Sequence, residues 1–133
     1  MMILNLTQHD PLPGQIKAGV INLLDAERVL LHRILNFEQL PTPTEITARA
    51  ETIAELAALY DINGDDHIEG RHATQAMIGG APFLMAPLEA ELRARGIEPL
   101  YAFAPRVSEE QIQPDGSVKK VNVFRHMGFV STY

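Results

Sequence analysis

Short runs of mainly apolar residues alternate along the chain with polar or glycine-containing turns. Residues 3–6 and 73–78 are such runs; the first ends at Thr7-Gln8-His9-Asp10 and the second at Gly79-Gly80. Residues 100–104 form a third run. Apolar runs of this length that stop at turn residues are typical of buried β-strands. We therefore expect three strands, the first two of which end abruptly in a turn.

Apolar residues spaced three and four positions apart predict helices between these strands. The clearest start is at Thr42-Pro43-Thr44-Glu45, which combines a capping threonine, a proline at the first helical position and the glutamate of a reciprocal capping box. That helix should run to about Tyr60. The other expected helices are a short one over 13–18 ended by Gly19, one over 26–35 capped by Asp25 with Val29, Leu30 and Ile34 on one face, and one over 83–95 closed by Gly96.

The order of these elements predicts the fold class. Strand, helix and strand over residues 73–104 form a parallel unit, whose crossover should be right-handed. Residues 107–112 and 118–124 flank Pro114-Asp115-Gly116, a pattern typical of a β-hairpin. A chain of 133 residues supports one hydrophobic core. We expect a single α/β domain over residues 1–133, a three-layer Rossmann-like fold with a mostly parallel sheet and a C-terminal antiparallel β-hairpin at its edge.

Composition narrows the classes of function. A net charge of -6 opposes broad binding to long nucleic acid, because that affinity comes from many Lys and Arg side chains. The absence of cysteine excludes thiolate nucleophiles, disulfides and cysteine-ligated metal clusters. No apolar run approaches the roughly 20 residues of a membrane helix, and the first residues lack a signal-peptide pattern. These features predict a cytoplasmic protein with no membrane partner, and they are compatible with a small anionic ligand.

The turns after the first two strands are the candidate site. In open α/β sheets, ligands bind beyond the carboxyl ends of the strands. The side chains of Thr7, Gln8 and His9 could bond a phosphate, and His9 could move a proton near neutral pH. Gly79 and Gly80 would let backbone N–H groups and a helix N-terminus approach an anion. The alternative is that both turns are purely architectural, and the pair lacks the full NAD or ATP signatures.

An acidic loop over residues 61–72 partly matches a calcium-binding loop. Asp61, Asn63 and Asp65 stand at its first, third and fifth positions. Asp66 and His72, however, occupy the positions that require glycine and a bidentate glutamate. We therefore expect a solvated loop and no metal site.

The densest positive cluster lies near the C-terminus and contains Lys119, Lys120, Arg125 and His126. Because strand side chains alternate, only one of the two lysines can join a pocket with Arg125 or His126. An ordinary solvated edge strand protected by lysines is the favoured explanation of the same residues.

Two segments resemble a known family. The opening MILNLTQHDPLPGQI is similar to the start of small single-domain CRISPR-associated proteins of the CARF-like superfamily, with Asn5, Thr7, His9 and Pro11 at the matching positions. The segment AMIGGAPFLMAPLEAELRARGIEPLYAF resembles the later strand-turn-helix-strand of that fold. The opening also resembles uncharacterised bacterial and prophage proteins that begin with the same NLTQH pattern.

The CARF-like resemblance implies a Rossmann-like homodimer in antiviral defence that binds a cyclic oligoadenylate at the subunit interface and needs no cofactor. Some members cleave this ligand without metal, by attack of a ribose 2′-hydroxyl on the adjacent phosphate, and His9 would then act as acid or base. The implied ligand-binding residues are Asn5, Thr7, Gln8, Gly79 and Gly80, with one of Arg106, Lys119 or Arg125 neutralising a phosphate.

Two other functions stay open. The chain could be a non-catalytic prophage or accessory protein that presents an interaction surface. A general nucleotide-binding α/β enzyme is the third reading, and it is disfavoured because no complete set of nucleophile, base and orienting group can be assembled from the sequence.

Overall fold

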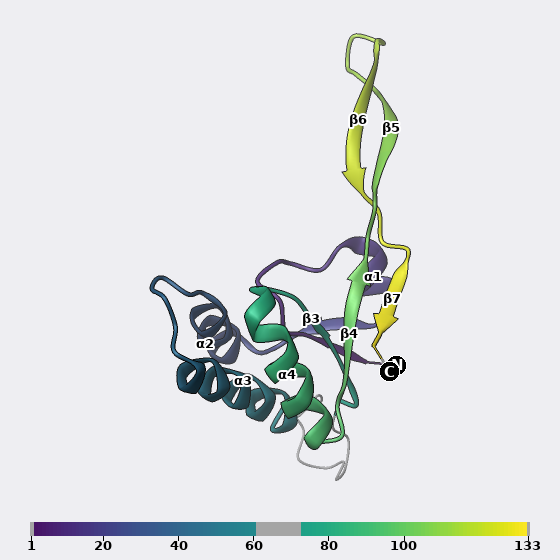
Figure 1. Ribbon diagram of the computed structural model, residues 1–133. Coiled ribbons are helices and arrows are strands. Elements are labelled where there is room, and N and C mark those ends of the chain that lie inside the picture. Colours follow the sequence, from purple (N-terminus) through teal and green to yellow (C-terminus); the bar gives the residue numbers. More distant parts are fainter. Residues whose placement is uncertain (1, 61–72, 133) are drawn as a thin grey trace.

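The computed structural model describes residues 2–60 and 73–132, and its centre is a five-stranded sheet (Figure 1). The strand order is β2-β1-β3-β4-β7. Neighbouring strands are parallel from β2 to β4, and β7 runs antiparallel to β4. This mostly parallel sheet with flanking helices confirms the predicted Rossmann-like α/β class. The strands are β1 (Ile3–Asn5), β2 (Val20–Asn22), β3 (Gln75–Ile78), β4 (Glu98–Phe103) and β7 (Gly128–Ser131).

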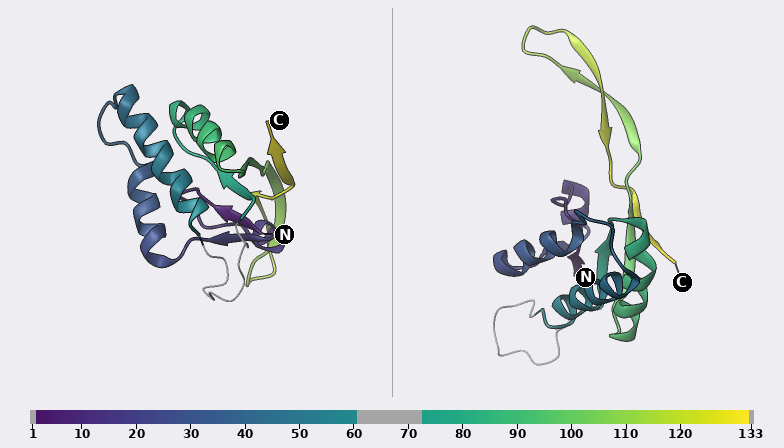
Figure 2. Two further views of the ribbon diagram at one scale, coloured as in Figure 1. Left: turned by 90° about the horizontal axis from the view of Figure 1, so that it is seen from below. Right: turned by 60° about the vertical axis from the view of Figure 1, so that its left-hand side comes forward.

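Three helices cover one face of the sheet, as Figure 2 shows: α2 (Asp25–Leu35), α3 (Pro43–Ala58) and α4 (Pro82–Ala94). Alternate strand residues point to the same face, so Leu4 and Leu6 join Ala76 and Ile78 beneath these helices. Helix α4 contributes a fully buried stripe at the predicted spacing, formed by Leu84, Leu88 and Leu92. This face holds the main hydrophobic core.

The opposite face carries a smaller cluster with less helical cover. Ile3, Val20, Met77 and Leu100 are buried there, and Phe129 packs against them. The five-residue helix α1 (Pro13–Lys17) lies next to the segment before β7, because a Cβ on Gly14 would come within 3.1 Å of the Cβ of His126. The His126 ring in turn packs against Phe129 at 4.7 Å between centroids. The two helical layers are therefore very unequal in size.

The predicted hairpin forms, but it is not the edge of the sheet. Strands β5 (Arg106–Ile112) and β6 (Val118–Phe124) make a separate two-stranded sheet. It projects from the body, as Figure 1 shows, and we call residues 106–124 the arm. The antiparallel edge is β7, which follows the arm in sequence. Neither β7 nor β2 was predicted, because neither short strand is followed by the abrupt turn that marks the ends of β1 and β3.

Helix α2 turns a different face to the core from the one predicted. Leu31 and Leu35 are its buried residues, whereas Val29 is 60% and Leu30 39% exposed. Of the three residues predicted to share one face, only Ile34 packs against the core. This helix has enough apolar residues to form two overlapping apolar faces, and the position of the sheet decides which of them is buried.

The predicted caps are partly realised. The Thr42 hydroxyl accepts a hydrogen bond from the Glu45 N–H at 3.2 Å, as expected for an N-cap. The Glu45 carboxylate does not bond back to Thr42 but accepts from Arg49 at 2.8 Å. Asp25 lies inside the first turn of α2 instead of capping it.

No helix within residues 2–60 and 73–132 is long and apolar enough to cross a lipid bilayer. The acidic segment 61–72, expected to be a solvated loop, lies outside the described residues.

Candidate functional site

The turns after β1 and β3 lie side by side. The two strands are parallel neighbours with Asn5 opposite Met77, and the Leu6 N–H donates to the Met77 carbonyl at 2.9 Å. A Cβ on Gly79 would come 3.5 Å from the Cγ2 of Thr7, so the turns are in contact. From β1 the chain continues to β2 on one side, and from β3 to β4 on the other. Such a reversal is the point where open α/β sheets bind ligands.

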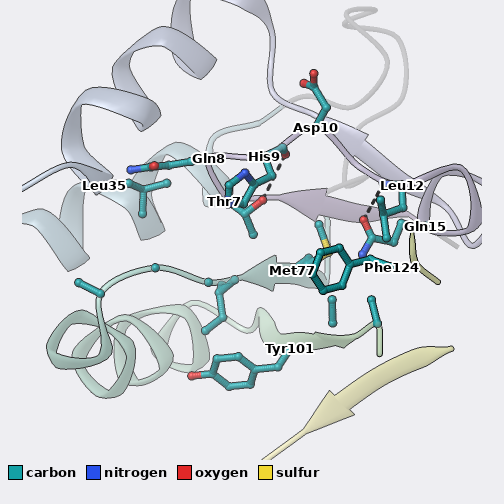
Figure 3. A pocket seen from close by; sticks show the side chains of 16 residues that line it. Thr7, Gln8, His9, Asp10, Leu12, Gln15, Leu35, Met77, Tyr101 and Phe124 are labelled. Atoms are coloured by element: carbon teal, nitrogen blue, oxygen red, sulfur yellow. Dashed lines mark hydrogen bonds between the residues drawn. The ribbon is translucent and has the colours of Figure 1, made fainter. Parts of the chain in front are cut away.

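A cavity of about 780 Å³ opens between these turns (Figure 3). This volume lies in the usual range for small-molecule sites. Figure 3 shows Gln8 and Leu35 at one end and Gln15 and Phe124 at the other, with Thr7 between them. We call this cavity the cleft, and its lining residues are Thr7, Gln8, His9, Asp10, Leu12, Gln15, Leu35, Met77, Ile78, Gly79, Gly80, Ala81, Tyr101, Ala102, Ala104 and Phe124.

Asn5, predicted to contact a ligand, is instead the side chain that shapes the first turn. It is fully buried and does not line the cleft. Its Nδ2 donates to the His9 carbonyl at 2.8 Å and to the Asn22 Oδ1 at 2.9 Å. Its Oδ1 accepts from the N–H of Thr7 at 3.0 Å and from the Thr7 hydroxyl at 2.7 Å. Asn5 therefore acts through the conformation of residues 7–9.

A second brace holds the far end of the same turn. The Asn22 Oδ1 also accepts from Arg28 Nη1 at 2.9 Å, and Arg28 Nη2 forms an ion pair with Asp10 at 2.9 Å. The Arg28 side chain is only 15% exposed, so this cation is fixed beneath the turn. The sequence analysis missed Asn22 and Arg28, because β2 was not predicted and an arginine in a predicted helix is expected to be exposed to solvent. Together with Asn5, they organise the turn before any ligand binds.

The side chains on the turn differ in what they can offer a ligand. The Thr7 hydroxyl donates its proton to Asn5, so it faces the cleft as an acceptor. An acceptor suits a ribose hydroxyl better than a phosphate. Gln8 and His9 are exposed, and within the described residues neither side chain forms a hydrogen bond or ion pair. The Gln8 amide and the His9 imidazole are the groups available to bind or to transfer a proton.

The glycine turn offers backbone donors. Gly80 has φ +147°, a conformation that favours glycine. Ala81, the N-cap of the 13-residue helix α4, makes no side-chain cap, and the first turn of α4 has no acidic residue. Pro82 at the start of α4 has no N–H, and the Leu84 N–H donates to the Ala81 carbonyl at 3.0 Å, so the positive end of the helix dipole is what this edge of the cleft offers an anion.

The predicted basic residues do not converge on the cleft of their own chain. Among the described residues that line the cleft, none is Lys or Arg. The Arg106 guanidinium lies 5.4 Å from the ring of Phe124, at the lip. Arg125 pairs with Glu109 in the arm, and Lys119 lies farther out, opposite Gln111. One of these three cations was expected to neutralise a phosphate, but the hairpin carries Arg106 and Lys119 away from the body, and Arg125 pairs with the hairpin.

Tyr101 lines the cleft through its ring, while its hydroxyl donates to Glu89 at 2.8 Å. Burial and the Glu89 carboxylate raise the pKa of Tyr101 to about 12. The pKa of Glu89 is lowered, chiefly by the hydrogen bond from Thr132 and further by Tyr101 and Arg93, against the opposing effect of burial. Tyr101 is therefore held as a neutral donor to Glu89 and is not placed to act as a base.

This cluster makes a pH-dependent contribution to stability. Because folding lowers the pKa of Glu89, its stabilisation is present above the ordinary value of 4.5 and is lost as pH falls through the lower folded value. We expect Glu89→Gln to be less stable than the wild type at pH 7, with the difference shrinking below about pH 4.5. Urea midpoints between pH 7 and pH 3 measure this difference. The exposed Glu51→Gln is the control, and a deficit of Glu89→Gln that stays constant with pH would contradict the expectation.

No group of three or more His, Asp or Glu side chains in the described ranges is arranged to hold a metal ion.

Comparison with known proteins places the chain only at the level of family. No curated protein and no solved structure matches it. A protein-family model matches residues 1–130, nearly the whole length, and its description names no ligand or activity. On this match, the chain belongs to the Uncharacterized protein MJ1673 family.

Proposed function

We propose that the cleft binds a small anionic nucleotide, and that this ligand is a cyclic oligoadenylate. The observation that carries the proposal is the meeting of the two turns at the β1/β3 reversal, where they open into one cleft of about 780 Å³. The resemblance of the opening segment to CARF-like proteins supports the same ligand class. A cytoplasmic homodimer in CRISPR-associated antiviral defence is the setting that this ligand implies.

The chemistry of the cleft matches the three parts of a nucleotide. The backbone N–H groups near Gly79 and Gly80 and the N-terminus of α4 suit a phosphate. The acceptor oxygen of Thr7 suits a ribose hydroxyl. The Phe124 ring at one end, with the apolar walls, suits an adenine base, since bases stack on aromatic rings.

His9 extends the proposal from binding to cleavage. Its side chain lines the cleft and has no internal hydrogen bond within the described residues, which supports a role as proton acceptor. In this reaction His9 removes the proton of a ribose 2′-hydroxyl, and the 2′-oxygen attacks the adjacent phosphorus. The bond to the 5′-oxygen breaks, that oxygen takes up a proton, and the product is a linear chain ending in a 2′,3′-cyclic phosphate.

The test is direct titration of the purified full chain with cyclic oligoadenylates of different ring sizes, followed by mass spectrometry of the products. We expect saturable binding of at least one ring size and formation of the linear product. His9→Ala should keep binding and lose product formation, because the imidazole transfers a proton. Gln8→Ala should weaken binding several-fold, while its matched control, the exposed Gln39→Ala, leaves it unchanged. Absence of both binding and products would overturn the proposal.

A non-catalytic interaction protein is the second candidate, and the arm favours it. A projecting hairpin with Ile112 81% and Val118 59% exposed is typical of a contact surface. If this is the whole function, arm substitutions such as Ile112→Lys should abolish activity in the host. Cleft substitutions should then leave that activity unchanged.

A further inference from the structure

No second layer packs on the arm within residues 2–60 and 73–132. Among these residues its two strands pair only with each other, with Val107 opposite Val123 and Ile112 opposite Val118. An isolated two-stranded ribbon is marginally stable in water unless something packs on it. We call the flanking residues 103–105 and 125–130 the root of the arm. The arm and its root carry six large apolar side chains that are about half or more exposed: Phe103, Ile112, Val118, Phe124, Met127 and Val130. This surface has the character of one that is covered in an assembly.

One face of the arm continues the wall of the cleft. Phe124 lines the cleft at the base of the arm, and residues two apart on a strand share a face. Asn122, Lys120 and Val118 therefore follow Phe124 outward on the same side. At ~3.3 Å per residue, Lys120 lies about 13 Å beyond Phe124. A molecule docked over the cleft mouth would lie along this face.

Charge favours a second copy as that molecule. The arm together with the adjoining Arg125 carries four basic side chains against three acidic ones, whereas the whole chain has a net charge of -6. The rest of the chain is thus strongly acidic and complementary to the arm. Lys119 and Lys120 are exposed, and neither forms an ion pair within the described residues. The cleft, in contrast, is lined by no Lys or Arg among those residues, although its proposed ligand is an anion.

Apart from Phe124 at its base, the arm does not line the cleft of its own chain in this conformation. Figure 1 shows it projecting away from the body. Its root is fixed in line with β4 by hydrogen bonds from the Arg125 N–H to Pro105 at 3.1 Å and from the Met127 N–H to Phe103 at 2.9 Å. Folding the arm back would break these bonds.

We propose that the arm of one protomer reaches over the cleft of a second copy and supplies there the positive charge that the cleft lacks, through Lys120. The two contacts are equivalent in a two-fold dimer. The role of Lys120 toward the ligand rests on the proposed function, whereas the contact between arm and partner does not need a ligand.

The ligand-free test is the oligomeric state of the full chain by sedimentation velocity. We expect a dimer for the wild type and a monomer for the double variant Ile112→Lys/Val118→Lys, whose two exposed positions face each other across the arm. Leu40→Lys, at a residue 96% exposed outside the arm, is the control and should stay dimeric. A monomeric wild type, or a dimer in the arm variant, would overturn the arm contact.

Proximity can be tested without ligand because the chain has no cysteine. In the variant Lys120→Cys/Gln8→Cys, one thiol lies on the arm and the other at the cleft. Mild oxidation should give a disulfide-linked dimer in high yield. The pair Lys17→Cys/Gln8→Cys, with an exposed thiol on α1 in place of the arm thiol, should remain largely monomeric in denaturing gels. Equal yields for both pairs would count against an arm lying over the partner's cleft.

Subunit mixing tests the charge supplied to the ligand. Lys120→Glu removes the proposed arm cation, and Gly79→Asp blocks the cleft, so each variant alone should lose cyclic oligoadenylate binding. After equal mixing and subunit exchange, only heterodimers contain an intact cleft beside an intact arm. Binding should return to about a quarter of the wild-type capacity if exchange is random. No recovery means that Lys120 does not act on the partner's cleft. If the wild type itself binds nothing, the proposed function fails while the sedimentation and cross-linking results still decide the arm contact.

Discussion

Asn5→Leu should lower the free energy of unfolding by about 3 kcal/mol and remove ligand binding. Leucine fills nearly the same volume but makes none of the four hydrogen bonds of Asn5. The N–H of Thr7 would then lose its partner in a partly buried place, at a cost of roughly 1–3 kcal/mol for an unsatisfied group, and the His9 carbonyl would keep only the Thr7 hydroxyl, at 3.3 Å. Urea denaturation and ligand titration measure the two effects.

Asn36→Leu is the matched control, because Asn36 is exposed at the end of α2 and, in the described part of the chain, only its backbone carbonyl is bonded, to Arg49. Its stability should change by less than about 0.5 kcal/mol, as is usual for surface sites. An equal loss in both variants, or an Asn5→Leu protein that binds ligand normally, would show that the turn keeps its conformation without Asn5.

Gly79→Asp should reduce affinity for the ligand about 100-fold, which corresponds to about 2.7 kcal/mol, without lowering stability. A Cβ at this position meets only Thr7, at 3.5 Å, so the side chain can be accommodated. Its carboxylate would lie where we place a phosphate and would repel it. Near the N-terminus of α4, the same charge is favourable by about 0.3–1 kcal/mol. Titration calorimetry and thermal unfolding should therefore change in opposite directions.

Two controls separate charge from size. Gly79→Asn adds nearly the same volume without the charge, and it should weaken binding much less than Gly79→Asp. Ala90→Asp makes the same change in net charge on the exposed side of α4 and should not affect binding. If Gly79→Asn and Gly79→Asp were equally weak, steric exclusion would be the cause and the anion site would be wrong.

The parts of the fold that could be predicted from the sequence are those encoded locally. The strands before Thr7 and Gly79 each combine an apolar run with an abrupt turn, and Thr42 marks the start of α3 through its own cap. β2 and β7 could not be found in this way, because no such turn follows them and only their pairing with β1 and β4 shows them to be strands. The choice of buried face on α2 likewise depends on where the sheet lies.

The candidate site was predictable only as far as adjacency follows from topology. Thr7, Gln8 and His9 meet Gly79 and Gly80 because the carboxyl ends of parallel strands share one edge. Asn22 and Arg28 contact the first turn only through the tertiary structure, so no sequence spacing could have predicted their role there. Whether the hairpin packs on the body or projects from it is equally invisible in its strand pattern.

Gly14 approaches His126 closely, so α1 packs against the root of the arm. Leu12 and Gln15, at either side of Gly14, form part of the cleft wall. Because of this contact, we expect a tilt of the arm to displace α1 and so to change the width of the cleft. A ligand in the cleft should in turn restrain the motion of the arm. Amide hydrogen exchange over residues 106–124 should therefore be slower with ligand than without it.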